Sequence, residues 1–152
     1  MLPLPSPAPT TAERIRSACA RAGGALLALE NGEASGKADA VATPVHHLLH
    51  DGSFAVAIPA DHEGMAGSTI SGSQALLELI DYAPLPLREP VRSLVWVRGR
   101  LQQVPPETVT QMLDVIAGEH PDPAFSHYRT SASPQSSWPK WRVTVTDCNG
   151  ST

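Results

Sequence analysis

Residues 90–104, PVRSLVWVRGRLQQV, constrain the fold more than any other stretch, because they combine strand-forming residues, strict alternation and concentrated charge. We expect a long central β-strand there, with successive side chains on opposite faces. One face carries Val91, Ser93, Val95, Val97, Gly99 and Leu101, and the other carries Arg92, Leu94, Trp96, Arg98 and Arg100. The valine face predicts core. The arginine and tryptophan face is too apolar for plain solvent and too charged for a closed interior, so we expect it to meet a partner subunit or a ligand.

The rest of the chain supplies short strands and two helices. A capping-box pattern at Thr10 and Glu13 opens one helix, which stops at Gly23 and Gly24, and a second helix follows two prolines and ends at Gly118. Asp51-Gly52 is the signal for a tight hairpin turn. Further strands are expected at residues 25–30, 41–50, 53–59, 74–82 and 141–146.

The length of 152 residues suits one domain with a core of its own. We expect an extended N-terminal arm over residues 1–10, a domain over 11–120, an irregular or flexible segment over 121–139, and a possible last strand and tail over 140–152. The net charge of −4 argues against a nucleic-acid surface. No apolar run is long enough to cross a bilayer, and the only two cysteines, Cys19 and Cys148, predict no disulfide framework, so we expect a cytoplasmic protein.

Four histidines, at positions 46, 47, 50 and 62, gather around the predicted hairpin. Residues four apart on a strand are separated by about 13 Å, which is too far to share one metal ion. Partly exposed edge-strand histidines are therefore the favoured interpretation, and no metal site is predicted. A haem iron needs one histidine only, which leaves His46, His50 and His62 as possible axial ligands.

The order of elements, with the segments AERIRSACARAGGALLALE, VHHLLHDGSFAVAIPADH and LLELIDYAPLPLREPVRSLVWVRGRL, resembles the FMN-binding split-barrel domains of the pyridoxamine 5′-phosphate oxidase type. More narrowly, it is similar to actinobacterial proteins that join such a barrel to a haem-utilisation-type domain. The resemblance covers roughly residues 12–120. It implies an α+β, mostly β fold: a split β-barrel of about six antiparallel strands with two covering helices.

The resemblance further implies a homodimer that holds a small anionic cofactor, FMN or haem, in a groove between subunits, with oxidoreductase-like chemistry. The candidate cofactor-binding residues are His46, His62, Ser68, Thr69, Ser71, Arg92, Trp96 and Arg98. The sequence departs from the family in having no lysine or arginine between Lys37 and Arg88, so a flavin phosphate would depend on the hydroxyl residues and backbone amides of the glycine-rich loop. A cofactor-free binding or regulatory module is the alternative, in which the strand arginines simply pair with Glu78, Asp81 and Glu89.

Overall fold

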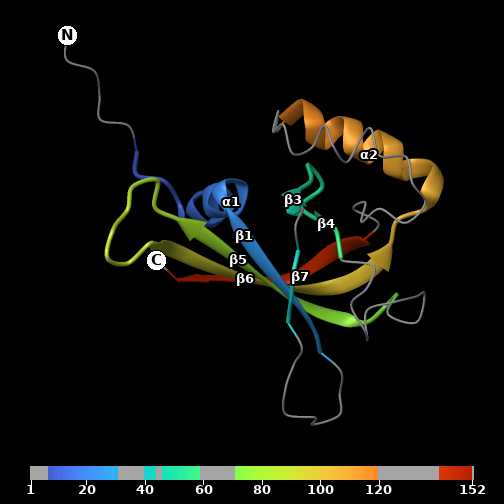
Figure 1. The fold of residues 1–152 in the computed structure, drawn as a ribbon, viewed down its shortest axis with the longest axis horizontal. Helices are drawn as coiled ribbons and strands as arrows, with labels where there is room; N and C mark the ends of the chain where they lie inside the picture. Colours follow the sequence, from blue (N-terminus) through green and yellow to red (C-terminus); the bar gives the residue numbers. More distant parts are fainter. Residues whose placement is uncertain (1–6, 31–39, 44–45, 59–70, 120–140, 152) are drawn as a thin grey trace.

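Seven strands and two helices make up the part of the chain that the structure, a computed structural model, describes: residues 7–30, 40–43, 46–58, 71–119 and 141–151 (Figure 1). In chain order they are α1 (Thr11–Arg21), β1 (Gly24–Leu29), β2 (Val41–Ala42), β3 (His46–Leu48), β4 (Phe54–Val56), β5 (Gln74–Tyr82), β6 (Val91–Gln103), α2 (Pro106–Glu119) and β7 (Trp141–Ser151). Neither helix is long and apolar enough to span a membrane.

The strands form one antiparallel sheet in the order β2-β1-β5-β6-β7-β4-β3. The expected mixed α+β class, with mostly antiparallel strands and two helices, is confirmed. The sheet is open, with β2 and β3 as its two edges, and closure into a barrel stays a prediction. The predicted single strand over residues 41–50 is wrong: its two halves are β2 and β3, at opposite ends of the sheet, because the chain crosses from one edge to the other between them.

The sheet curls strongly. Ala42 ends one edge strand and His46 begins the other, and four residues span at most about 14 Å. A flat sheet of seven strands spaced by about 4.8 Å would hold its edges about 29 Å apart. The two edges must therefore turn toward each other, and side chains from both ends of the sheet, Val41 in β2 and Phe54 in β4, join one buried cluster with Leu27, Leu77 and Val97.

The alternation predicted for β6 is confirmed between Ser93 and Leu101. Ser93, Val95, Val97, Gly99 and Leu101 are buried, whereas their neighbours are half-buried or exposed. Val91 breaks the pattern and is 42% exposed, so its placement in the core was wrong. A register shift causes this: Asp81 pairs with Ser93 but Tyr82 pairs with Val91, which leaves Arg92 as an extra residue at a β-bulge.

Helix α1 lies on the inner face of the sheet and contributes Ala18 and Cys19 to the main core. Its predicted capping box is present, with the Thr10 hydroxyl accepting from the amide of Glu13 and the Glu13 carboxylate accepting from the amide and hydroxyl of Thr10. Two hydrogen bonds from Thr10 lower the pKa of the Glu13 carboxyl below its ordinary value, and the bond from the Thr10 backbone amide contributes more than the bond from its hydroxyl.

Helix α2 covers the other side of β4. Met112 and Ile116 pack with Ala55 and Val104 in a second buried cluster, while Phe54 and Val56 face the main core. Strand β4 is consequently buried on both faces, and Figure 1 shows α2 over the β3–β4 hairpin. The C-terminal residue of α2, Glu119, accepts a hydrogen bond of 2.8 Å from the buried His47 and is 2.7 Å from the imidazole of His50.

The hairpin turn between β3 and β4 provides a test of the local fold. Gly52 has a φ of +86°, in the left-handed region, and open space around it. We expect Gly52→Ala to lower the free energy of unfolding by about 1 kcal/mol through backbone strain alone. Gly118→Ala, at a helical position with equally open surroundings, should raise it by up to about 1 kcal/mol. Urea denaturation measures both, and an unchanged stability of Gly52→Ala would contradict the turn geometry.

Candidate functional site

The outer face of the sheet is centred on Trp96. Its indole Nε1 donates a hydrogen bond of 2.7 Å to the carboxylate of Glu78, which is its register partner on β5. We define the Trp96 face as this pair and the half-buried aliphatic side chains around it on three adjacent strands, which are Leu26, Leu76, Ile80 and Leu94. Since the only polar atom of the indole already has a partner, the whole face can be covered without leaving that donor unsatisfied.

Charged side chains border the Trp96 face. Arg98 forms an ion pair of 3.2 Å with Glu30, and Arg100 donates to the carbonyl of Gly72 at 3.4 Å. Both arginines are exposed. Pairing of strand arginines with acidic residues, one of the two alternatives open from the sequence, is what the structure shows for Arg92, which contacts the expected Asp81. Arg98 pairs with Glu30, directly after β1, rather than with one of the expected residues.

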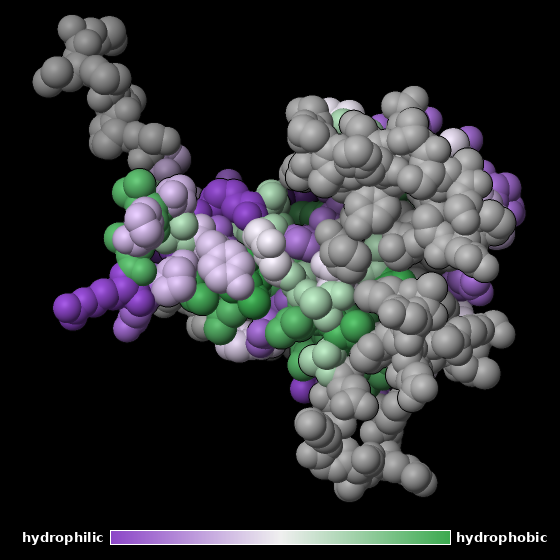
Figure 2. Space-filling model, viewed as in Figure 1, coloured by the Kyte–Doolittle hydropathy of each residue, from purple (hydrophilic) through white to green (hydrophobic). Residues whose placement is uncertain are grey.

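A shallow apolar groove of about 550 Å³ adjoins the Trp96 face at the β1–β2 edge, lined by Leu26, Ala42, Ile80 and Tyr82 among others. The Tyr82 ring lies so close to Gly23 and Gly24 that a Cβ at either glycine would be 3.4 Å from it. The connection between β5 and β6 adds exposed Leu85 and Leu87, and Figure 2 shows apolar surface there and over the middle of the described sheet.

On the inner face, the carboxylate of Asp81 is held by a network of charges. Asp81 is only 2% exposed, and Arg92 contacts both of its oxygens at 3.0–3.2 Å. Arg21 from α1 adds a bond of 3.2 Å, and the Ser93 hydroxyl donates at 3.3 Å. The β-bulge makes this possible, because it releases Arg92 from the strand alternation and lets its side chain reach Asp81.

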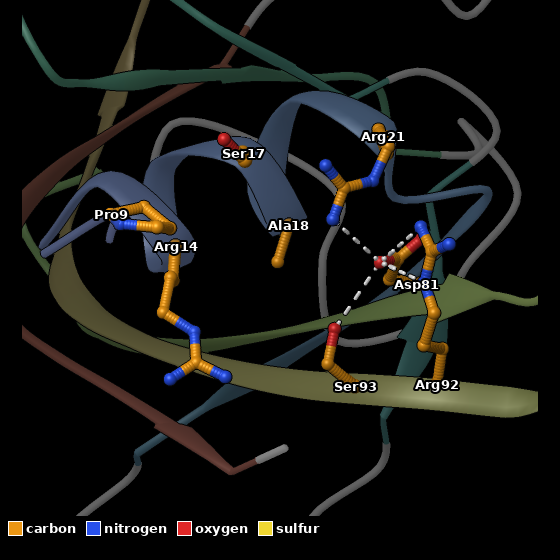
Figure 3. A pocket seen from close by; sticks show the side chains of 8 residues that line it. All are labelled: Pro9, Arg14, Ser17, Ala18, Arg21, Asp81, Arg92 and Ser93. Atoms are coloured by element: carbon orange, nitrogen blue, oxygen red, sulfur yellow. Dashed lines mark hydrogen bonds and ion pairs between the residues drawn. The ribbon is translucent and has the colours of Figure 1, made fainter. Parts of the chain in front are cut away.

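This network forms one wall of a cleft of about 380 Å³ between α1 and the β5–β6 pair (Figure 3). Arg14, Ser17 and Ala18 of α1 form the opposite side. Figure 3 shows the Arg14 side chain reaching from the helix toward β6, away from the Asp81 network. No hydrogen bond or ion pair of this side chain is found within the described residues.

This cleft was not predicted from the sequence. Arg92 was assigned to the same face as Trp96, whereas its guanidinium bonds to an inner-face carboxylate. Arg14 and Arg21 lie in the predicted first helix and were not among the candidate site residues. One signal was present: Asp81 follows Ala75, Leu77 and Leu79 on the buried face of β5, where a carboxylate needs a cationic partner.

The described histidines do not converge on one site, because His47 and His50 both contact Glu119 whereas His46 does not. His46 Nε2 donates to the carbonyl of Ala22 at 2.8 Å, and its buried Nδ1 has no partner among the described residues. His47 points to the α2 side instead. Within the ranges that the structure describes, no group of three histidine, cysteine or acidic residues is arranged to hold a metal ion.

The remaining candidates come from the glycine-rich loop. Ser71 is described, and its hydroxyl accepts from the amide of Gln103 at 3.4 Å. His62, Ser68 and Thr69 lie outside the described residues. Of the described candidates, Trp96 and Arg98 share the outer side of the sheet, and Arg92 lines the inner cleft.

Comparison with protein-family models, curated proteins and solved structures finds no match for this chain.

The Asp81 network predicts a large stability effect. Asp81→Asn removes the buried negative charge and leaves two guanidinium groups facing each other, which should lower the free energy of unfolding by about 3 kcal/mol. Glu30→Gln is the matched control, since it breaks an exposed pair and should cost less than about 1 kcal/mol. Denaturant titration measures the free energy of unfolding of both variants. Equally small decreases in the two variants would contradict a large contribution of the Asp81 network to stability.

Proposed function

We infer that the protein is a split-barrel binding module that forms a homodimer through its Trp96 face and holds its ligand in the groove beside that interface. A cytoplasmic location is part of this proposal. The observation that carries it is the half-buried indole of Trp96, with its Nε1 bonded to Glu78, among aliphatic side chains of three neighbouring strands.

The chemistry of this face supports pairing with a second copy. Tryptophan is among the residues most enriched at the energetic centres of interfaces, where surrounding aliphatic contacts exclude water. Charges of both signs, Arg98 and Glu30, lie at the border. A two-fold axis brings the same patch of each subunit into contact, so that Arg98 of one copy can meet acidic groups of the other.

The curl of the sheet supports the barrel. Its edge strands are four residues apart in the chain and its two ends share one core, as a barrel with an incomplete seam requires. The described strands leave the seam between β2 and β3 without ladder hydrogen bonds.

Two versions of the module differ in cofactor. The cofactor-free version is favoured by the hydrogen bond of Trp96 to Glu78 and the ion pair of Arg98 with Glu30, because both side chains already have partners within the subunit. The flavin- or haem-binding, oxidoreductase-like version is favoured by the exposed guanidinium groups of Arg98 and Arg100, which match a phosphate or a propionate. His46 does not suit haem ligation as it stands, because its Nε2 is bonded to a carbonyl and its Nδ1 is buried.

Sedimentation equilibrium tests the dimer. The native chain should be dimeric, and Trp96→Ala should raise the dimer dissociation constant at least about thirtyfold, as expected for a central interface residue. Val115→Ala, at an exposed apolar position on α2, should leave it unchanged. Circular dichroism establishes that both variants are folded. A native chain that stays monomeric at high concentration would overturn the proposal.

Titration of the dimer with FMN and with haemin separates the two versions. A flavin or Soret band that saturates with one equivalent per subunit, and that weakens in Arg98→Ala, supports the cofactor-binding version. A dimer that binds neither supports the cofactor-free version.

A further inference from the structure

We propose that the cleft between α1 and the β5–β6 pair is a second site, independent of the Trp96 face, that binds the phosphate group of a small phosphate monoester. The cleft lies on the inner side of the sheet, where Arg21 and Arg92 hold the buried carboxylate of Asp81 on one side and Arg14 extends from α1 toward β6 on the other (Figure 3).

The charges of the cleft do not balance within the described residues. Three guanidinium groups line it, and arginine stays protonated at every accessible pH. Asp81 is the only carboxylate among the described lining residues. Two positive charges therefore remain for a ligand, which matches a phosphate monoester dianion better than a single carboxylate.

Asp81 does not need all of these arginines. Arg92 alone satisfies both carboxylate oxygens, through Nη2 to Oδ1 and through Nε and Nη2 to Oδ2. The additional bond from Arg21 is a single contact of 3.2 Å by a side chain that is 52% exposed. Arg21 can therefore share its remaining donors with a ligand while Arg92 keeps the buried carboxylate in place.

No hydrogen bond or ion pair among the described residues explains the position of the Arg14 side chain. This side chain lines the cleft and forms no hydrogen bond or ion pair with the described residues, although other residues of the same helix pack closely on the sheet. Ser17, one turn further along α1, also lines the cleft, and its hydroxyl points away from the Arg14 guanidinium (Figure 3). Guanidinium groups from α1 and from β6 can approach a tetrahedral anion from two sides of the cleft.

The size of the cleft limits the ligand. A volume of about 380 Å³ lies near the lower end of the range for small-molecule sites, and the cleft is partly open to solvent through the exposed halves of Arg21 and Arg92. A phosphate with a short organic group fits these dimensions.

Isothermal titration calorimetry at constant ionic strength tests the site with inorganic phosphate, glycerol phosphate and acetate. Both phosphates should bind, glycerol phosphate at least as tightly as inorganic phosphate, and acetate should bind at least about tenfold more weakly because it carries one charge. Arg14→Ala should weaken phosphate binding about tenfold, as loss of one charge-assisted contact does. Arg16→Ala, on the same helix but outside the cleft lining, should leave it unchanged.

Amide shifts in a ¹⁵N–¹H spectrum locate the site, and phosphate should move the signals of Ser17, Ala18 and Ser93. Absence of phosphate binding, equal losses in Arg14→Ala and Arg16→Ala, or acetate binding as tight as phosphate would each overturn the proposal. Glycerol phosphate binding more weakly than inorganic phosphate would overturn the assignment to a monoester. None of these results depends on whether the chain is dimeric.

Discussion

The backbone pairing of β7 is the constraint on which the rest of the structure depends. Strand β7 lies between β6 and β4, with Gln103 paired to Trp141 on one side and Val56 paired to Trp141 on the other. In the described sheet, the β3–β4 hairpin has no other ladder to the remaining strands. Strand β7 thus joins the two parts of the described sheet, although it follows all the other described strands in the chain. Folding of the β3–β4 hairpin onto the core therefore requires long-range pairing.

The curl of this sheet determines which surfaces are available for function. Because the ends of the sheet turn toward each other, its inner face fills with Leu27, Leu77, Val97 and Phe54, and α1 lies on the same side. The outer face of β1, β5 and β6 receives neither helix. One pair of strands therefore carries two different surfaces: Trp96 with Glu78 on the outside, and Asp81 with its arginines on the inside.

Much of this arrangement could be predicted from the sequence, because local patterns report local structure. Alternation assigned the buried face of β6 from Ser93 to Leu101, Asp51-Gly52 marked the hairpin, and Thr10 with Glu13 marked the start of α1. Each of these features is decided by a few neighbouring residues whose preferences agree with the final fold.

Features that depend on distant pairing could not be predicted. The separation of residues 41–50 into two edge strands follows from the curl of the whole sheet, which no short window reports. The position of Arg92 depends on a bulge between β5 and β6, since one extra residue redirects a side chain that strict alternation places on the other face. The cleft combines that bulge with two arginines from α1, of which Arg21 is 60 residues away from Asp81 in the chain. The divergence of His46 and His47, by contrast, follows from strand alternation alone, because consecutive residues point to opposite sides.

Truncation of the chain after residue 140 tests the central role of β7 most directly. Without β7, the β3–β4 hairpin loses its only described ladder to the sheet and β6 becomes an unpaired edge. Urea denaturation followed by circular dichroism should then show loss of the cooperative transition that the full chain displays. A truncated chain that unfolds cooperatively at the same urea concentration as the full chain would contradict this account of the fold.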